Sequence, residues 1–328
     1  MISRRDVLRS AALASVAMPF VSRAGFADDA WPQREIHAIC GFPPGSGADI
    51  FVRFYSKQLE DMAGRTVIVE NKSGAFGNIA SEYVAKSKPD GYTLFICPGS
   101  SFLAAAPSLF RKLSFDPIND FDHITTISKL PFVLAVSGDS PYKSVAELVD
   151  YLKKQGDKAS YGSLANTGLV SSELFKANFG LQTVEVKYKD TGACLNDLWG
   201  GNIAFTHIDP AAGAAHFQSG KLRPLATSAA ERIAALKDIP SAKEAGITNS
   251  NIIAWWSVHT PKGTPKPVLD KYEAWFNKIA VAPETVKFLA NSGADPFPGS
   301  SAQLKELLVK DTAAWHEYVK IAKIDVLG

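Results

Sequence analysis

The segment IHAICGFPPGSGADIFVRFYSKQLEDM, residues 36–62, contains three patterns in direct succession. Residues 36–41 form a short apolar run that predicts a buried strand. Residues 42–47 are rich in glycine and proline and predict a loop. Residues 48–62 place apolar side chains on one side of a helix. A strand, a loop and a helix in this order are the first half of a β-α-β unit, so the segment predicts an α/β fold.

The same alternation continues to residue 97 and starts again near residue 132. This spacing predicts a right-handed, mainly parallel sheet in each of two units. Further strands are expected at residues 66–70, 92–97, 132–137, 159–162, 184–187, 203–207 and 222–227. Further helices are expected at residues 78–86, 145–154 (with Ser144 as N-cap), 168–178, 191–199 and, as a helical tail, within 267–323.

Two α/β units followed by a helical tail predict two lobes. Because the tail would return to the first lobe, two strands should cross between the lobes, and the candidates for these hinge strands are residues 132–137 and 252–259. This organisation assigns residues 28–133 and 254–328 to lobe 1 and residues 134–253 to lobe 2. Ligands of such sheets bind beyond the carboxyl ends of the strands. The ligand is therefore expected in a cleft between the lobes.

The first 27 residues are typical of an export signal. Paired arginines, Arg4 and Arg5, precede an apolar run of 11 residues, and small residues end at Ala27. Such a run is too short to span a bilayer, which takes about 20 residues. The segment predicts a Tat-like signal peptide removed before Asp28, and hence a periplasmic protein. The alternative is an amphipathic helix that the mature chain keeps. No later stretch is apolar enough to span, so the mature protein is expected to be soluble.

Removing this leader changes the charge balance. The whole chain has a net charge of +2, and residues 1–27 contribute +3 through four arginines and one aspartate, which leaves −1 for residues 28–328. Without a basic surface field there is no reason to expect nucleic acid or anionic lipid as a partner. An anionic ligand would have to be held by local groups.

Three loops rich in glycine and small polar residues lead into predicted helices: residues 43–49, 73–78 and 162–168. Glycine lets backbone N–H groups approach a ligand closely, and a helix N-terminus offers unpaired N–H groups that bind anions without lysine or arginine. Micromolar affinity needs about 8 kcal/mol, which about four to six charge-assisted hydrogen bonds can supply. The alternatives are that each loop is purely structural, and that Asp49 caps its helix rather than touching the ligand.

Enzymatic signatures are weak. The six histidines show neither HExxH spacing nor a metal cluster, no hydrolase nucleophile elbow follows a strand, and the first glycine-rich loop lacks the features of a P-loop or a dinucleotide fingerprint. We expect no enzyme activity, no metal and no cofactor. His207 and Asp209 end one predicted strand and could line the cleft or, alternatively, act as an acid–base pair. Cys40, Cys97 and Cys194 form no close pair and are expected to be free buried thiols.

Eight stretches of the chain, taken in order, resemble the Bug-type substrate-binding proteins of tripartite tricarboxylate transporters. They are FPPGSGAD (42–49) with Arg53, VENKSGAFGN (69–78), PDGYTL (89–94), YGS (161–163), DLWGG (197–201), SGKLRPLATS (219–228), IPSAKEAG (239–246) and PKGTP (261–265). The series covers nearly the whole mature chain.

This resemblance implies a two-lobed periplasmic binding fold of type 2, the Venus-flytrap arrangement, that closes on its ligand. It implies a small organic carboxylate (a di- or tricarboxylate or an aromatic acid) held by backbone N–H groups and bridging waters, and an integral membrane transporter as partner. A monomer is expected. The site residues expected in the first lobe are Phe42, Pro44, Ser46, Gly47, Ala48, Gly74, Ala75 and Asn78, and those in the second are Ser163, Asn166, Thr167, Asp190, Thr191 and Asp209.

The second lobe departs from the family pattern. Lys187-Tyr188-Lys189-Asp190 stands where the family has Pro-Tyr-Lys-Gly, and the stretch from residue 163 to 175 is about two residues short and lacks the family's histidine. Asp190 could oppose a second carboxylate, accept a hydrogen bond from a hydroxyl or amino group, or be an exposed loop residue. A ligand-presenting sensor protein for a membrane histidine kinase is the functional alternative to transport.

Overall fold

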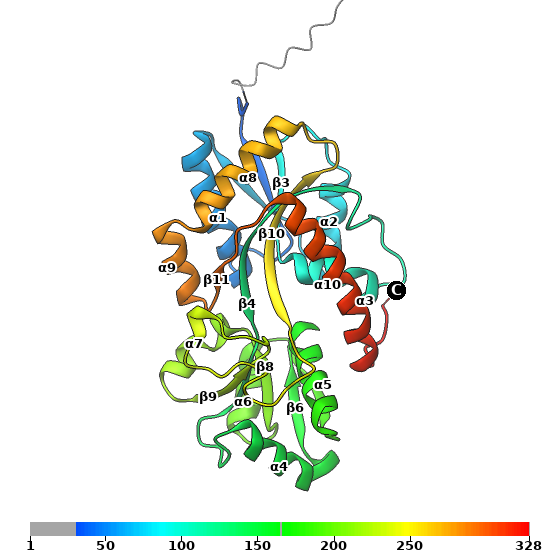
Figure 1. Cartoon of the computed structure of the whole chain (residues 1–328), viewed down its shortest axis with the longest axis vertical. Coiled ribbons are helices and arrows are strands. Elements are labelled where there is room, and N and C mark those ends of the chain that lie inside the picture. Colours follow the sequence, from blue (N-terminus) through cyan, green and yellow to red (C-terminus); the bar gives the residue numbers. More distant parts are fainter. Residues whose placement is uncertain (1–30, 165, 328) are drawn as a thin grey trace, which may run out of the picture. The chain divides into compact units, whose positions relative to one another are not determined.

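Two β-sheets organise the chain in a computed structural model that describes residues 31–164 and 166–327. The first sheet has the strand order β11-β4-β10-β3-β1-β2 and the second the order β7-β6-β8-β5-β9. Residues 32–328 form one compact unit, and within it Figure 1 shows the first sheet above the second. The predicted signal peptide, residues 1–27 with its cut before Asp28, lies outside the described residues.

The first sheet is covered by helices on both faces (Figure 1). Its strands are β1 (Ile36–Cys40), β2 (Val67–Asn71), β3 (Thr93–Cys97), β4 (Phe121–Pro131), β10 (Ile253–Pro261) and β11 (Asp295–Pro296). Its helices are α1 (Gly47–Ala63), α2 (Asn78–Ala85), α3 (Ala106–Leu109), α8 (Lys266–Ala280), α9 (Pro283–Asn291) and α10 (Ser301–Ile321), with short turns η1 (Ala75–Gly77) and η2 (Ser100–Ala104). The predicted helical tail is thus three helices.

The second sheet is built in the same way from the middle of the chain. Its strands are β5 (Val133–Ser137), β6 (Ser160–Ser163), β7 (Val184–Lys187), β8 (Phe205–Ile208) and β9 (Leu222–Thr227). Its helices are α4 (Val145–Gln155), α5 (Asn166–Phe179), α6 (Thr191–Trp199) and α7 (Pro210–Gln218), with short turns η3 (Gly156–Lys158) and η4 (Ala234–Leu236). Among the described residues, no helix is both long and apolar enough to cross a membrane.

The two-lobed α/β architecture is confirmed, but the prediction of mainly parallel sheets is wrong, because both sheets are mixed. In the first sheet, β1 pairs in parallel with β2 and β3, whereas β10 runs antiparallel to β3 and β4. In the second sheet, β6 is parallel to β7 and β8, whereas β5 is antiparallel to β8 and β9. The antiparallel strands follow from the path of the chain, because β5 enters the second sheet from the first, and β10 enters the first sheet from the second. They therefore start at the end where the parallel strands finish.

The chain crosses between the sheets at two places. It leaves the first sheet through β4, enters the second through β5 at Phe132, and returns through β10. The predicted hinge strand at residues 132–137 is therefore β5, a member of the second sheet, and β4 is the crossing strand that the sequence analysis missed. A buried serine joins the two crossings: Ser228 Oγ accepts from Phe132 N (2.9 Å) and donates to Ile252 O (2.6 Å), while Ser228 N donates to Phe132 O (2.8 Å).

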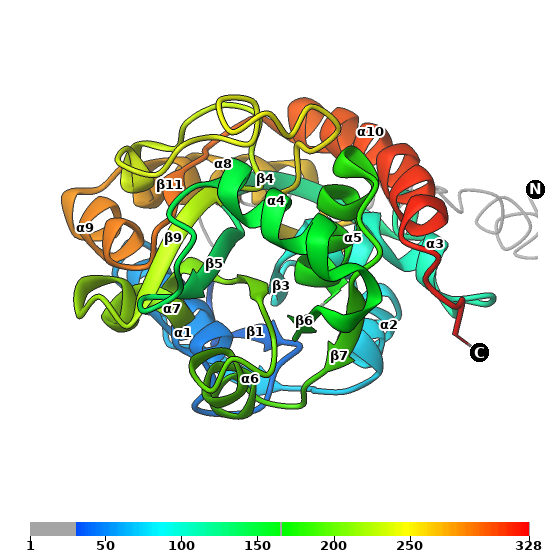
Figure 2. The ribbon, with the colours of Figure 1, turned by 90° about the horizontal axis from the view of Figure 1, so that it is seen from below.

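Helices of the two sheets also touch. Val170 and Leu174 of α5 belong to the same buried cluster as Trp315 of α10, and the two helices lie side by side in Figures 1 and 2. On another face, the Asp295 carboxylate of β11 accepts from the N–H groups of Ala234 and Ala235, both at 2.8 Å. Hydrophobic packing and one carboxylate thus join the sheets outside the crossing strands.

Two buried histidines form a chain of hydrogen bonds inside the first sheet. His123 Nε2 donates to Ile118 O (3.1 Å), so the neutral ring presents Nδ1 as the acceptor for His259 Nδ1 (2.9 Å). Ser257 Oγ then donates to His259 Nε2 (2.7 Å). Burial lowers the pKa of both histidines.

Candidate functional site

In the loop between β1 and α1, the side chains of Ser46 and Asp49 hydrogen-bond the backbone groups of the loop. Ser46 caps α1, since its Oγ accepts from Asp49 N (3.2 Å) and donates to Pro43 O (2.9 Å). The Asp49 carboxylate is 1% exposed. It accepts from Gly45 N (2.8 Å), Arg53 Nε (2.8 Å) and Asn71 Nδ2 (2.7 Å). Asp49 therefore holds this loop through its carboxylate, but the helix cap that the sequence offered as its alternative role is Ser46.

The ionisation of Asp49 follows from these contacts. Burial opposes the charged form, but the hydrogen bonds from Arg53, Asn71 and Gly45 outweigh it and lower the pKa of the carboxyl. The carboxylate is an internal counter-charge to the N-terminus of α1. The sequence-predicted residues Phe42, Pro44, Ser46, Gly47 and Ala48 lie along this loop, and Phe42 stacks on Phe102 with ring centroids 4.9 Å apart.

The loop between β2 and α2 has the opposite character. Four consecutive residues have positive φ: Gly74 (127°), Ala75 (46°), Phe76 (53°) and Gly77 (90°). The Gly74 conformation is open essentially to glycine alone, and no side chain caps α2. Asn78, the first residue of α2, buries its Oδ1 without a hydrogen-bond partner among the described residues. Gly77 N donates to Gly74 O (3.0 Å) and Asn78 N donates to Ala75 O, so the helix-terminal N–H groups left for a ligand are those that follow Asn78, and Asn78 Oδ1 is a buried acceptor.

Two predicted residues of the second lobe serve as helix caps. Asp190 accepts from Ala193 N (2.9 Å) at the start of α6, and Asp209 accepts from Ala211 N (2.8 Å) at the start of α7. Burial raises the pKa of Asp209 against the lowering effect of these backbone bonds. Thr191 is the first residue of α6. The aspartate side chains occupy the donors that an anion would otherwise use.

The remaining predicted residues of the second lobe surround the start of α5. Ser163, at the end of β6, is 6% exposed and donates through Oγ to Glu185 Oε1 (2.5 Å). Asn166 and Thr167 are the first residues of α5. No side chain of this set is a cation, so a ligand anion would meet hydroxyl, amide and backbone groups here.

His207 does not form an acid–base pair with Asp209. Its ring is buried, and Nδ1 hydrogen-bonds Ser172 Oγ at 2.9 Å. Burial lowers the pKa of His207 to about 3. In the described part of the chain no hydrogen bond joins the two side chains, and the histidine packs as a neutral core residue.

A cavity of about 510 Å³ opens beside the second and third glycine-rich loops. We call this cavity the side chamber. Among its lining residues are Phe76, Leu109, Ser163, Leu164, Asn166, Leu169, Glu185, Lys187 and a C-terminal segment that includes Ile324 and Leu327. Of the predicted site residues, the side chamber contains Ser163 and Asn166. The others lie along their loops outside its lining.

Sequence reasoning missed several lining residues of the side chamber. Phe76 lies between the predicted residues Ala75 and Asn78, and its place in the same glycine-rich loop was a usable signal. The C-terminal segment gave no such signal. Its position depends on long-range pairing, in which Leu327 N donates to Leu109 O (2.8 Å) and Arg111 N donates to Leu327 O (3.0 Å).

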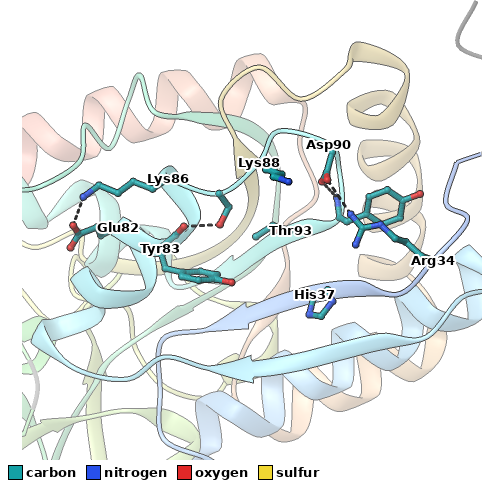
Figure 3. Close-up of a pocket in the computed structure, with 10 residues that line it drawn as sticks. Arg34, His37, Glu82, Tyr83, Lys86, Lys88, Asp90 and Thr93 are labelled. Carbon is teal, nitrogen blue, oxygen red and sulfur yellow. Dashed lines mark hydrogen bonds and ion pairs between the residues drawn. The ribbon is translucent and has the colours of Figure 1, made fainter.

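A second depression, of about 580 Å³, lies at the far end of α2 and holds none of the predicted site residues (Figure 3). Four of its charged side chains pair with one another: Arg34 binds Asp90 at 3.0 Å, and Lys86 binds Glu82 at 2.5 Å, whereas Lys88 has no ion pair among the described residues. His37 pairs with Glu70 at 2.6 Å. Because these charges are already paired, this groove gives less reason to expect a ligand than the loops do.

The cysteine prediction is confirmed, since Cys40, Cys97 and Cys194 are all free and buried. Among the described residues, no group of three or more His, Cys, Asp or Glu side chains could hold a metal ion.

Comparison with known families identifies the class of protein. Residues 51–324 match the model of the TctC family, the tripartite tricarboxylate transporter family receptor. The chain therefore belongs to this family and is a solute-binding receptor of the periplasmic binding type. Protein BugT of Bordetella pertussis is 28% identical over 307 residues, which cover 92% of this chain and 94% of BugT. The Bug-type resemblance is thus confirmed.

Solved structures support the same assignment. The R. palustris protein Rpa4515, solved with adipate, is 31% identical, with a TM-score of 0.79 over 90% of this chain and 100% of its own. MatC from Rhodopseudomonas palustris, solved with bound malate, is 25% identical, with a TM-score of 0.73 over 88% of this chain and 99% of its own.

Proposed function

We propose that this chain binds a small organic carboxylate in a cleft between its two lobes and delivers it, in the periplasm, to the integral membrane subunits of a tripartite tricarboxylate transporter. The lobes comprise residues 28–133 with 254–328, and residues 134–253. The observation that carries the proposal is the left-handed turn Gly74–Gly77 ahead of an α2 that no side chain caps.

The chemistry of the turn suits a carboxylate. A helix N-terminus without a side-chain cap keeps backbone N–H donors and about half a positive charge. Carboxylates accept such bonds, and each is worth about 1.5–3 kcal/mol. Asn78 Oδ1, a buried acceptor without a partner among the described residues, would take a hydroxyl group or a bridging water rather than the carboxylate itself. The adipate and malate of the two R. palustris structures support the same ligand class.

The two glycine-rich loops of the first lobe have different parts in this proposal. The loop at residues 42–48 offers the wall of the site, with Phe42, Pro44, Ser46, Gly47 and Ala48, and Asp49 fixes its shape. The loop at residues 73–78 offers the donors. In the second lobe, Ser163, Asn166 and Thr167 face the ligand with uncharged polar groups, while Asp190, Thr191 and Asp209 form the starts of α6 and α7 at the same side of the sheet.

The test is a matched pair of glycine variants. Gly74→Val places a side chain where the ideal Cβ already lies 2.7 Å from Ile79 Cδ1, so it should block backbone approach and weaken adipate binding at least 100-fold by calorimetry. Gly64→Val is the control, since Gly64 also has positive φ (62°) but ends α1 away from these loops. Unchanged affinity in Gly74→Val would remove this turn from the site.

Transport itself needs a separate test. Adipate uptake by cells that carry the membrane subunits should depend on this chain and should fall with Gly74→Val but not with Gly64→Val. If uptake is independent of the chain while calorimetric binding persists, the chain is a carboxylate receptor that serves another partner.

A further inference from the structure

The side chamber contains more apolar surface than a short dicarboxylate can use. Phe76 from the β2–α2 loop is 55% exposed, and Leu327 from the C-terminal segment is 41% exposed. Leu164, Leu169 and Ile324 add apolar groups to a lining that also contains Ser163, Asn166, Tyr188 and five charged side chains. A volume of about 510 Å³ lies in the range of pockets that hold a ligand with a substantial apolar body.

The charges around the side chamber disfavour a second anion. Its lining includes three carboxylates, Glu173, Glu185 and Asp325, but two ammonium groups, Lys187 and Lys323. Because Glu173 and Glu185 each have an ammonium partner, Asp325 and Lys323 remain and balance each other, so a distal carboxylate on the ligand would meet no net positive charge here.

Two of the three lining carboxylates are paired with ammonium groups, whereas Lys323 has no ion pair among the described residues. Glu173 takes the Lys176 ammonium at 2.7 Å, and Lys187 lies 3.8 Å from Glu185. Ser163 Oγ, which could have donated to a ligand oxygen, donates to Glu185 instead (2.5 Å). These pairs leave the side chamber suited to an uncharged group.

From these observations we infer that the ligand carries a single carboxylate and an apolar body of about six to eight carbons, aromatic or aliphatic. The carboxylate binds at the turn Gly74–Asn78, and the body enters the side chamber against Phe76 and Leu169, which select for it. This inference rests on the proposed function, because it places the carboxylate at the same turn.

A matched set of acids tests the inference on the full chain. Hexanoate and adipate have the same number of carbons and differ by one carboxylate, and 6-aminohexanoate replaces that group by a cation. Calorimetry should give hexanoate a Kd at least tenfold lower than either. From butanoate to octanoate, Kd should fall about fourfold per methylene until the side chamber is full.

The outcomes separate the two proposals. If adipate or 6-aminohexanoate binds more tightly than hexanoate, the single-carboxylate inference is overturned while carboxylate binding stands. If none of these acids binds, and phenylacetate, malate and citrate also give no heat, both proposals fail.

Variants locate the body of the ligand. Phe76→Ala should weaken hexanoate and phenylacetate at least tenfold and leave acetate unchanged, because acetate does not reach the side chamber. Tyr83→Ala is the control, since Tyr83 is an exposed aromatic (42%) near the other end of α2, in the groove of Figure 3. Equal effects on hexanoate and acetate, or no effect on either, would contradict the placement.

Discussion

The two glycine-rich loops of the first lobe look alike in sequence and differ in structure. FPPGSGAD closes on itself through Asp49, whose buried carboxylate takes three hydrogen bonds. SGAFGN has four successive residues with positive φ, from Gly74 to Gly77, and precedes a helix without a side-chain cap. Glycine therefore has two uses here. In the first loop, Gly45 donates its N–H to the buried Asp49 carboxylate and so helps to hold the turn. In the second loop, Gly74 and Gly77 allow the positive φ angles of the turn.

This contrast separates stability from binding. Changes in the Asp49 loop should act first on the free energy of unfolding. Changes in the Gly74–Gly77 turn should act first on ligand affinity, since that turn has few internal contacts to lose.

The largest effect on stability is expected for Asp49→Ala. The change removes the acceptor of Gly45 N and one of the two acceptors of Asn71 Nδ2, which keeps its bond to Phe42 O, and a loss of about 2–3 kcal/mol in the free energy of unfolding follows. Chemical denaturation measures it. Asp61→Ala, an exposed position on the same helix, is the control and should change stability by less than about 0.5 kcal/mol. A loss no larger than that of the control would show that the loop does not depend on Asp49.

The same carboxylate gives a pH prediction. Because the folded-state pKa of Asp49 is lowered, its contribution is complete above the unfolded pKa, near 4, and is lost as the pH falls through the folded value. The difference in unfolding free energy between wild type and Asp49→Ala should be constant from pH 7 to 5 and shrink below pH 4. His123 and His259, whose pKa values are also lowered, destabilise both proteins below about pH 6.5 and cancel in the difference. A difference that persists at pH 2 would contradict the ion-pair explanation.

A smaller effect of opposite sign is expected in the second loop. Ala75 has φ 46°, which costs an alanine about 1 kcal/mol. Ala75→Gly should therefore raise the free energy of unfolding by up to about 1 kcal/mol, less the added freedom of the unfolded chain. The matched change next to the first loop, Ala48→Gly, falls in the first turn of α1 and should lower the free energy of unfolding by about 0.5–1 kcal/mol. If both substitutions raised the free energy of unfolding, or both lowered it, the contrast between the two loops would be wrong.

The smallest effect is expected for Gly47→Ala. Gly47 begins α1, has no positive φ and has no atom within 4 Å of its ideal Cβ. The unfolding free energy should change by less than about 0.5 kcal/mol, and circular dichroism during thermal melting suffices to measure it. Adipate affinity is measured on the same variant. A loss of binding without a loss of stability would identify Gly47, like Gly74, as a residue whose backbone the ligand approaches.

Local patterns predicted much of this molecule. The alternation of strands and helices predicts two α/β units, and the glycine-rich patterns predict the loops that precede α1, α2 and α5. Ser144 caps α4 as expected, since its Oγ accepts from Glu147 N at 3.2 Å. These features depend on residues close together in the chain. Propensity and capping rules therefore suffice for them.

Long-range pairing decided the rest. The antiparallel placement of β10, the C-terminal wall of the side chamber and the bond between Ser163 and Glu185 all join residues far apart in sequence. Asp190 and Asp209 cap helices. The sequence could not show this, because an aspartate just before a helix is equally compatible with a cap and with a ligand contact.

Ser228 has a mechanical consequence. Its hydroxyl and amide tie residue 132, where the chain leaves one lobe, to residue 252, where it comes back. These hydrogen bonds fix the two crossing segments to each other at one point, so the segments can rotate together but cannot slide past each other. In the proposed function, closure of the lobes on a ligand would therefore turn about the point where Ser228 joins the two crossing segments.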